Sequence, residues 1–319
     1  MSNYSINILC SCGGFCSQLN FILSWYYAID GKNHKLNILN HKCKFGHCHW
    51  KKMIGSLNIW NEIFEPYEFH NCNYIDLPSI LSSEEYTNVK NSVVYMAWHS
   101  NDLEKYNLNS FKNKYNTIIT TQIYENIDNI RIDLNRIYKK YLTPKSNILQ
   151  QIKPYLNKFK NNYVIGLQIR TSTHYRLEKK FTSSQVVDEF IKTSKNVKTS
   201  KNVKYFIATA NLNILNKVKK YFGVENVIHL RTIRDENDIN EKDYMKSKNH
   251  DWSYDKKFKM SINKYGVKQY LIDVYLDVLL LSNCDLIIGG TSNILLNSLM
   301  LNPNNKFKIP EILKNCGSK

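Results

Sequence analysis

The sequence has 319 residues, of which 43% are hydrophobic and 22% charged, and its formal net charge is +17. This composition excludes a disordered chain, and the length favours two domains of about 150 residues each. The longest apolar stretch, residues 279–288, is interrupted by polar residues, and the start lacks the pattern of a secretory signal. We therefore expect no transmembrane segment and a cytoplasmic protein, or a catalytic fragment separated from its anchor.

The positive charge raises the question of nucleic acid. Lysines occur in every segment, without a stripe of alternating basic and aromatic residues, which favours a solvated basic surface over a nucleic-acid site. Such a surface would attract a nucleotide diphosphate through its long-range field. The eight cysteines are expected as free thiols, because nothing marks the chain as secreted. Residues 41–49 are rich in Cys and His but lack the paired spacing of a zinc module, so no metal site is expected.

The first half has the pattern of an α/β unit. Apolar runs predict strands at 6–9, 36–39, 92–96 and 117–121, and apolar residues at helical spacing predict a helix around 19–27. The turn at Gly13 and Gly14 lacks a full dinucleotide fingerprint. It is either a tight strand-to-helix connection or part of an acceptor site. Residues 126–161 are helical and basic, with Pro144 and Pro154 as breakers, and predict a domain boundary near residue 155.

The second half alternates strand and helix more clearly. Strands are expected at 163–169, 204–208, 227–230 and 285–288, and helices at 184–193, 212–222 and 267–281. This alternation indicates a parallel sheet covered by helices. A tandem hexapeptide, 193–198 and 199–204, is expected to lengthen a surface loop. The polar connection 231–262 is either a lid over a site or a disordered insertion.

Arg170 follows the apolar run 163–169, and Glu178 comes eight residues later. The carboxyl end of a buried strand is where open α/β sheets bind ligands. A guanidinium can grip phosphate with two parallel hydrogen bonds, although a surface ion pair is the alternative for Arg170 considered alone. The pair predicts an enzyme that holds a phosphorylated donor beside a general base.

Other loops converge on the same edge of this predicted sheet. The turn 289–292, a glycine pair followed by Thr and Ser that opens a helix, would present backbone N–H groups and hydroxyls to an anion. Thr209 follows the next strand, and Asp277 lies in the helix before the last one. With Arg170, these residues predict a binding site for a nucleotide diphosphate.

Three segments in this order resemble the GT-B fucosyltransferase superfamily, which includes α1,6-fucosyltransferases, nodulation fucosyltransferases and protein O-fucosyltransferases. They are Gln168-Ile169-Arg170-Thr171, Ile207-Ala208-Thr209-Ala210, and residues 277–293 from Asp277 to Gly289-Gly290-Thr291-Ser292-Asn293. A weaker resemblance covers 12–19 and 60–66. The resemblance implies an α/β protein of two Rossmann-like domains that face each other across a cleft. Residues 1–155 would form the acceptor-side domain and 156–319 the nucleotide-sugar-binding domain.

The resemblance also implies inverting transfer of fucose from GDP-fucose to a glycan hydroxyl. Arg170 would bind the β-phosphate and stabilise the leaving diphosphate, Glu178 would act as general base, and Asp277 would accept hydrogen bonds from guanine. The remaining donor-site residues would be Gln168, Thr209, Gly290, Thr291 and Ser292, with Thr291 and Ser292 on phosphate oxygens. No metal or other cofactor is expected, because arginine takes the metal's role.

The chain departs from the family's motifs at several positions. Gln168 replaces a guanine-side histidine, Thr171 a second arginine, and Ala210 and Asn211 a pair of aspartates. Glu178, beside two lysines, has a plain surface charge as its alternative role. The alternatives for the whole protein are the same scaffold with another nucleotide sugar, or a catalytically inert glycan- or nucleotide-binding protein. The expected partners are the donor and a glycan or glycoprotein acceptor, without nucleic acid.

Overall fold

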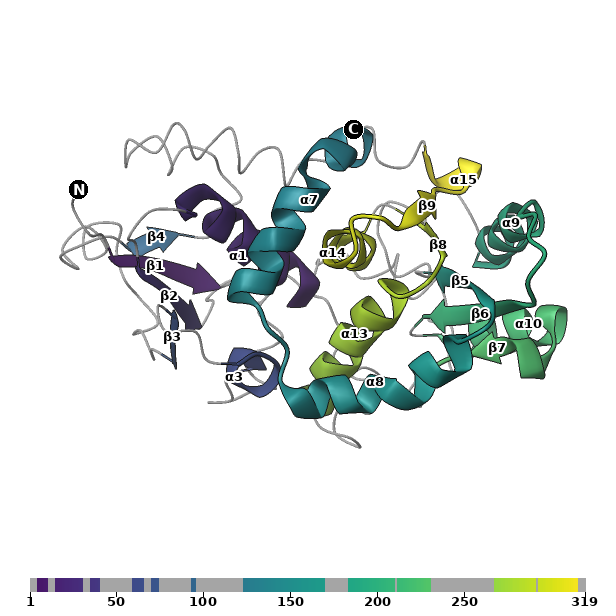
Figure 1. Cartoon of the computed structure of the whole chain (residues 1–319), viewed down its shortest axis with the longest axis horizontal. Coiled ribbons are helices and arrows are strands. Elements are labelled where there is room, and N and C mark those ends of the chain that lie inside the picture. Colours follow the sequence, from purple (N-terminus) through teal and green to yellow (C-terminus); the bar gives the residue numbers. More distant parts are fainter. Residues whose placement is uncertain are drawn as a thin grey trace, which may run out of the picture. The chain divides into compact units, whose positions relative to one another are not determined.

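The computed structural model of the protein describes residues 5–10, 15–30, 35–40, 59–65, 70–74, 93–95, 123–169, 183–209, 211–230, 267–290 and 292–314. The chain divides into two compact units, Met1–Ser146 (unit 1) and Asn147–Lys319 (unit 2). Figure 1 labels the elements of both units. The sequence places the domain boundary a little later, near residue 155, and that assignment stays a prediction.

In the described part of unit 1, four parallel strands pair in the order β3-β2-β1-β4. They are β1 (Ser5–Cys10), β2 (Lys35–Asn40), β3 (His70–Tyr74) and β4 (Val93–Tyr95), accompanied by helices α1 (Phe15–Ile29), α3 (Ile59–Ile63) and α7 (Ile123–Tyr141). The strands expected near residues 6, 36 and 92 are confirmed. β3 was not predicted, because its polar sequence lacks apolar alternation. The strand expected at 117–121 and the turn at Gly13 and Gly14 lie outside the described residues.

A buried face of α1 packs against α7. Leu19, Ile22, Leu23 and Tyr26, the residues whose helical spacing predicted α1, are all fully or almost fully buried. The ring of Tyr26 stacks on that of Tyr141, with centroids 4.3 Å apart. The apolar face of α1 therefore forms the core of unit 1, as its sequence pattern predicts.

A cluster of polar side chains forms hydrogen bonds between the end of α1 and α7. Asp30 Oδ2 accepts a hydrogen bond from Arg136 Nη1 at 2.6 Å, and Oδ1 accepts from Lys140 Nζ at 2.9 Å and Tyr141 Oη at 3.0 Å. Burial alone would raise the pKa of the Asp30 carboxyl, but the hydrogen bonds from Lys140, Arg136 and Tyr141 outweigh it and lower the pKa to about 2. The carboxylate is therefore stabilised in its charged form.

In the described part of unit 2, five parallel strands pair in the order β7-β6-β5-β8-β9. They are β5 (Tyr163–Gln168), β6 (Val203–Ala208), β7 (Val227–Ile228), β8 (Leu286–Gly289) and β9 (Lys306–Lys308). The helices are α8 (Ser146–Phe159), α9 (Ser183–Lys195), α10 (Leu212–Phe222), η1 (Val224–Asn226), α13 (Val267–Leu281), α14 (Asn293–Leu301) and α15 (Glu311–Lys314). The predicted parallel sheet covered by helices is confirmed, with β9 as an additional edge strand.

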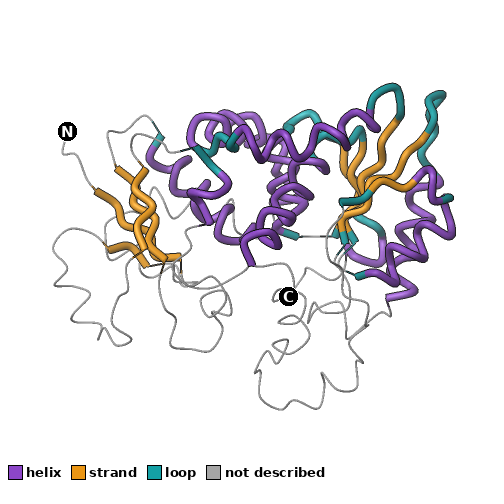
Figure 2. The backbone as a smooth tube through the Cα atoms, turned by 90° about the horizontal axis from the view of Figure 1, so that it is seen from below, coloured by secondary structure: helices purple, strands orange, loops and turns teal. Residues whose placement is uncertain are grey.

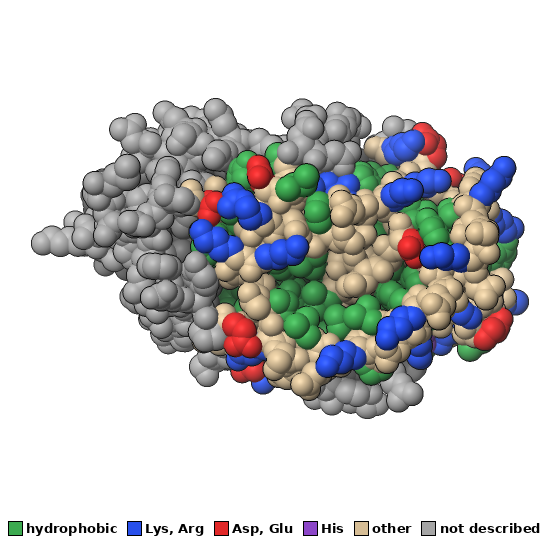
Figure 3. All heavy atoms as spheres, viewed as in Figure 1, with side chains coloured by type: hydrophobic (Ala, Val, Ile, Leu, Met, Phe, Trp, Pro, Cys, Tyr) green, Lys and Arg blue, Asp and Glu red, His purple; other side chains and the backbone are tan. Residues whose placement is uncertain are grey.

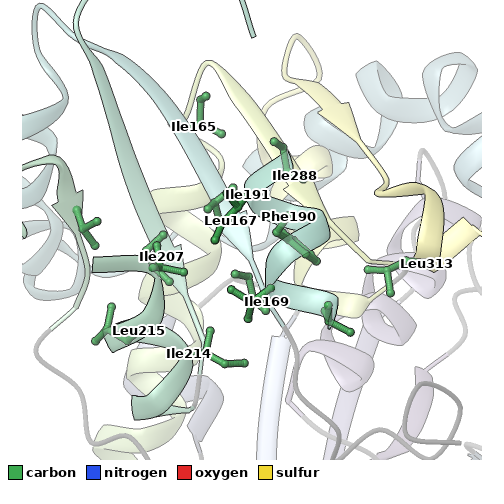
Figure 4. Close-up of a cluster of buried hydrophobic side chains, with 14 of the residues drawn as sticks. Ile165, Leu167, Ile169, Phe190, Ile191, Ile207, Ile214, Leu215, Ile288 and Leu313 are labelled. Carbon is green, nitrogen blue, oxygen red and sulfur yellow. The ribbon is translucent and has the colours of Figure 1, made fainter. Parts of the chain in front are cut away.

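Helices cover both faces of the second sheet (Figures 1 and 2). On one face, Ile165, Leu167 and Ile169 join apolar residues of α9, α10 and α15 in one buried cluster (Figure 4). On the other face, α13 packs against β5 and β6. Because successive residues of a strand point to opposite faces, β5 contributes Val164, Gly166 and Gln168 to the α13 side.

Gly166 permits the close approach of α13 to β5. A Cβ at this position would stand 2.8 Å from Leu281 Cδ2 and 2.9 Å from Cys284 Sγ, so any side chain would clash. The Cys284 thiol below it is free, and burial raises its pKa well above the usual value. This thiol is therefore a packing group.

One predicted breaker was wrong. Pro154 lies inside α8, which continues to Phe159. Proline removes the hydrogen bond to the carbonyl four residues earlier, that of Gln150. Pro154 and Gln150 are both exposed, so water can satisfy that carbonyl.

The middle of the tandem hexapeptide lies in a connection between elements, as the sequence predicts. Residues 196–202 form the connection between α9 and β6.

Among the described residues, no helix combines the length and the apolar character that a membrane span requires. Figure 3 shows lysine and arginine side chains spread over the displayed face of the described residues, with acidic side chains between them. This distribution agrees with the solvated basic surface that the sequence suggests.

The Asp30 cluster gives a prediction about stability. Replacement of Asp30 by Asn should lower the free energy of unfolding at neutral pH by about 1 kcal/mol, a modest loss because solvent screens such pairs. The side chains of Arg136 and Lys140 are 55% and 43% exposed. Since the folded pKa lies below the ordinary value of 3.8, the stabilisation is complete above that value and is lost as the pH falls toward about 2.

Urea unfolding of the wild type and of Asp30→Asn between about pH 7 and about pH 3 would measure this effect. The difference between the two proteins should shrink as the solution becomes more acidic. Asp133→Asn, on an exposed position of α7, is the matched control and should change stability little. An equal loss in both variants would contradict the role given to Asp30.

Candidate functional site

The strand order of unit 2 creates one topological switch point. From β5 the chain proceeds outward through β6 to β7, whereas β8 pairs with the other side of β5 and is followed outward by β9. Neighbouring strands whose connections diverge in this way leave a crevice at their carboxyl ends, where open α/β sheets bind ligands. Gln168 pairs with Gly289 in the β5–β8 register. These two residues therefore mark the place of the candidate site.

Two predicted site residues contact each other at this place. Ser292 Oγ donates to Gln168 Oε1 at 2.9 Å and accepts the backbone N–H of Leu295 at 3.2 Å, so Ser292 is the N-cap of α14. Gln168 is 3% exposed and Ser292 9%. The hydroxyl hydrogen of Ser292 is thus engaged with Gln168, and a contact of this hydroxyl with phosphate stays a prediction.

The glycine pair lies directly beside this bond. A Cβ on Gly289 would stand 3.3 Å from Gln168 Oε1, which is a tight contact, and 3.4 Å from Leu295 Cδ2, which is an ordinary one. Gly290 is half-buried, and its missing Cβ would stand 3.1 Å from Leu313 Cδ1. Glycine at both positions lets the turn after β8 lie close to β5 and α15.

Asp277 lies four residues before Leu281, on the side of α13 that approaches Gly166. Four helical residues advance about 6 Å, and the two strand residues from Gly166 to Gln168 advance about 6.6 Å. The helix of a parallel crossover runs opposite to its strands. Asp277 is therefore at about the level of Gln168, on the same face of the sheet, and its side chain is half-buried.

Thr209 lies at the same edge of the sheet but on the opposite face. Thr209 comes two residues after Ile207 and therefore points to the same face of the sheet as Ile207. Ile207 belongs to the core cluster that α9 and α10 cover. The Thr209 hydroxyl accepts the backbone N–H of Asn211 in a long contact of 3.4 Å. Among the described candidates, the structure thus groups Gln168, Ser292 and Asp277 on the side of α13 and α14, and Thr209 on the side of α10. The missing Cβ of Gly290 would face Leu313 of α15.

Asn211 has a local role that the motif comparison did not identify. Its Oδ1 accepts the backbone N–H of Ile214 at 3.1 Å, which makes it the N-cap of α10. The side chain is 5% exposed. Asparagine before an apolar helical repeat is a standard N-cap signal that would have revealed this role.

Several predicted features lie outside the described residues. They are Arg170, Glu178, Thr291, the connection 231–262 and the Cys- and His-rich segment 41–49. Within the described ranges, no group of three or more His, Cys, Asp or Glu side chains is placed to hold a metal ion. Metal independence stays a prediction for the chain as a whole.

No protein-family model matches the chain, and no curated protein matches it. Several solved structures match the chain. The fucosyltransferase NodZ from Bradyrhizobium matches with a TM-score of 0.51 and 15% identity, over 94% of each chain. NodZ α-1,6-fucosyltransferase soaked with GDP-fucose matches with a TM-score of 0.50 and 14% identity, over 94% of this chain and 93% of that one. The same enzyme co-crystallised with GDP matches with a TM-score of 0.50 and 16% identity, over 94% of each chain. At such identities the likeness concerns the fold alone: the chain has an α/β fold like that of these solved structures.

The cap at Asn211 can be tested by stability. Asn211→Ala should lower the free energy of unfolding by about 1 kcal/mol, because the N–H of Ile214 loses its acceptor. Asn211→Asp should retain the stability of the wild type, since aspartate caps helices equally well. Thermal unfolding of both variants would measure this difference. A loss of the same size in both would mean that Asn211 stabilises the protein by some contact other than the cap.

Proposed function

We propose that the protein is a metal-independent GT-B glycosyltransferase that transfers fucose from GDP-fucose to a hydroxyl of a glycan or glycoconjugate, with inversion at the anomeric carbon. The observation that carries this proposal is the fold shared with NodZ over 94% of each chain, together with the crevice at the carboxyl ends of β5 and β8. In the proposal, residues 156–319 bind the donor, residues 1–155 lie on the acceptor side, and a cleft separates the two domains.

The proposed donor site uses the edge described above. Asp277 accepts hydrogen bonds from the guanine, and Gln168, Thr209, Gly290, Thr291 and Ser292 surround the nucleotide. The position of Asp277 near the level of Gln168 supports this arrangement, because a base and a diphosphate can then span the crevice. The net charge of +17 would raise the local concentration of an anionic donor.

The reaction makes two demands on the residues around the anomeric carbon. The bond between that carbon and the β-phosphate oxygen breaks, and its electron pair leaves with GDP, where Arg170 stabilises the charge. The acceptor oxygen forms the new bond from the opposite side and gives its proton to Glu178. Both residues follow β5 in the sequence, and the proposal places them beside its carboxyl end.

The first test concerns the nucleotide. Calorimetric titration should give clearly tighter binding for GDP than for UDP, and Arg170→Ala should abolish GDP binding, because a bidentate contact to phosphate is lost. Lys201→Ala, an exposed residue of the connection before β6, removes the same charge far from the carboxyl edge and should bind GDP normally. Tighter binding of UDP would point to another nucleotide sugar. Retention of GDP binding by Arg170→Ala would remove the proposed phosphate anchor.

The second test concerns the base. Glu178→Gln should bind GDP with wild-type affinity but release GDP from GDP-fucose at least about 100-fold more slowly in the presence of acceptor glycans, because the amide cannot take the proton. Glu311→Gln, an exposed residue of α15, is the control and should retain turnover. Unchanged turnover in Glu178→Gln would exclude this residue from the mechanism. Wild-type protein that binds GDP-fucose without any turnover would favour an inert binding protein.

A further inference from the structure

We infer that Ser292 is a positioning residue, whose hydroxyl orients the Gln168 amide so that Nε2 donates a hydrogen bond to an acceptor atom of the bound nucleotide. The inference rests on the proposed function, because it concerns the same crevice. It changes the roles within the site: Gln168 contacts the ligand, and Ser292 acts through Gln168.

The first argument is the burial of the amide. Gln168 ends β5 at the switch point, and its side chain is 3% exposed. Its oxygen is satisfied by Ser292 at 2.9 Å. Among the described residues, none accepts a hydrogen bond from Nε2. Nε2 is not among the fully buried side-chain atoms without a partner, so it remains accessible at this edge, and a ligand acceptor in the crevice can receive its hydrogen bonds.

The second argument is that the orientation of the amide is fixed. The Ser292 oxygen accepts the N–H of Leu295, and Leu295 is completely buried in the first turn of α14. This bond anchors the hydroxyl oxygen, and its hydrogen is directed to Gln168 Oε1. Because Oε1 and Nε2 belong to one planar amide, fixing the oxygen toward Ser292 also fixes the direction of the two N–H bonds, one of which then points opposite to the C=O bond.

The third argument is the space around the amide. A Cβ on Gly289 would stand 3.3 Å from Gln168 Oε1 and 3.4 Å from its Cβ. Gly289, which pairs with Gln168 between β5 and β8, therefore leaves enough space for the amide to reach Ser292. Ser292, Leu295 and Gly289 together hold the Gln168 amide in one orientation. The ligand therefore meets an amide that is already oriented for binding.

The recognised chemistry is that of a hydrogen-bond acceptor. Since Ser292 engages the oxygen of Gln168, its N–H groups remain for a ligand, and an amide does not titrate. The acceptor is a base oxygen or nitrogen, or a phosphate oxygen. Guanosine, which has no phosphate, and inorganic pyrophosphate, which has no base, separate these two sources.

Gln168→Glu tests the donor. The carboxylate has nearly the same shape and can still accept the Ser292 hydroxyl, but it has no N–H. GDP binding should weaken at least about tenfold. With guanosine, which the new carboxylate does not repel, a similar loss would indicate a base acceptor. A loss with pyrophosphate alone would indicate a phosphate acceptor if the uncharged variant Gln168→Leu, which also has no N–H, shows the same loss, since the carboxylate itself repels pyrophosphate. Unchanged affinity for GDP, guanosine and pyrophosphate would overturn the inference.

Ser292→Gly and Ser292→Thr test the positioning. Glycine is nearly as good an N-cap as serine, so Ser292→Gly should unfold at nearly the wild-type temperature while GDP binding weakens several-fold. Threonine retains the hydroxyl and should restore binding. Loss of binding in both variants would mean that the site tolerates only serine for reasons of space, and would overturn the positioning role.

A double-mutant cycle decides between this inference and two independent contacts. If Ser292 acts through Gln168, Ser292→Gly should have almost no further effect on GDP affinity in the Gln168→Glu protein. Additive effects would overturn the inference and leave the proposed function intact. Wild-type protein that binds no GDP would instead overturn the proposed function, and the inference with it.

Discussion

The pairing of β5 with β8 is the contact on which unit 2 depends, because it joins segments more than a hundred residues apart and creates the switch point. Three features lie along this strand pair, namely a pair of hydrogen bonds, a close contact at a glycine and a hydrogen bond between side chains. At its start, Val164 N–H donates to Asp285 Oδ2 at 2.7 Å and Asp285 N–H donates to Val164 O at 2.9 Å. In its middle, Gly166 admits Leu281 and Cys284. At its carboxyl end, Gln168 accepts from Ser292. The apolar residues between them provide most of the burial, and these features set the register and the spacing.

The same features explain why polar residues occur in an otherwise apolar core. A buried amide or hydroxyl without a partner would cost about 1–3 kcal/mol, so each buried polar side chain must either be bonded or await a ligand. Ser292 and Asn211, which are both buried, accept backbone N–H groups, and Ser292 also donates to Gln168. The oxygen of Gln168 is bonded as well, whereas its nitrogen donates no hydrogen bond among the described residues. The polar groups at this edge thus include side chains that build the crevice, such as Ser292 and Asn211, and the Gln168 nitrogen, which we infer to be available to a bound molecule.

The sequence predicted the parts that rest on periodicity. α10 and α13 have the bounds expected from their apolar spacing, since a helix buried on one side must repeat every three to four residues. β3 and β9 lie at sheet edges, and the exposed lysines of β9 show no burial pattern that could reveal a strand. Pro154 did not end α8, because its loss of one hydrogen bond occurs on the solvated side. The convergence of Gln168, Ser292 and Gly290 followed from topology alone, whereas the bond between Gln168 and Ser292 depends on side-chain orientations across 124 residues, which no local pattern encodes.

The departures from the fucosyltransferase motifs have different meanings in the structure. Asn211 replaces an aspartate, but it caps α10, a role that either residue can fill, so this change by itself says nothing against donor binding. Gln168 replaces a histidine and keeps an N–H donor without a titratable group. Since Gln168, Thr209 and Ser292 are neutral at any working pH, the charge of a diphosphate in the proposed reaction must be balanced by Arg170 and by backbone N–H groups. Only Glu178 and Asp277 among the proposed residues could then give the reaction a pH dependence in the acidic range. In the proposed site, Arg170 would meet the diphosphate end of the ligand and the carboxylate of Asp277 the base end, an arrangement suited to a ligand whose negative charge is concentrated at one end, as in a nucleotide sugar.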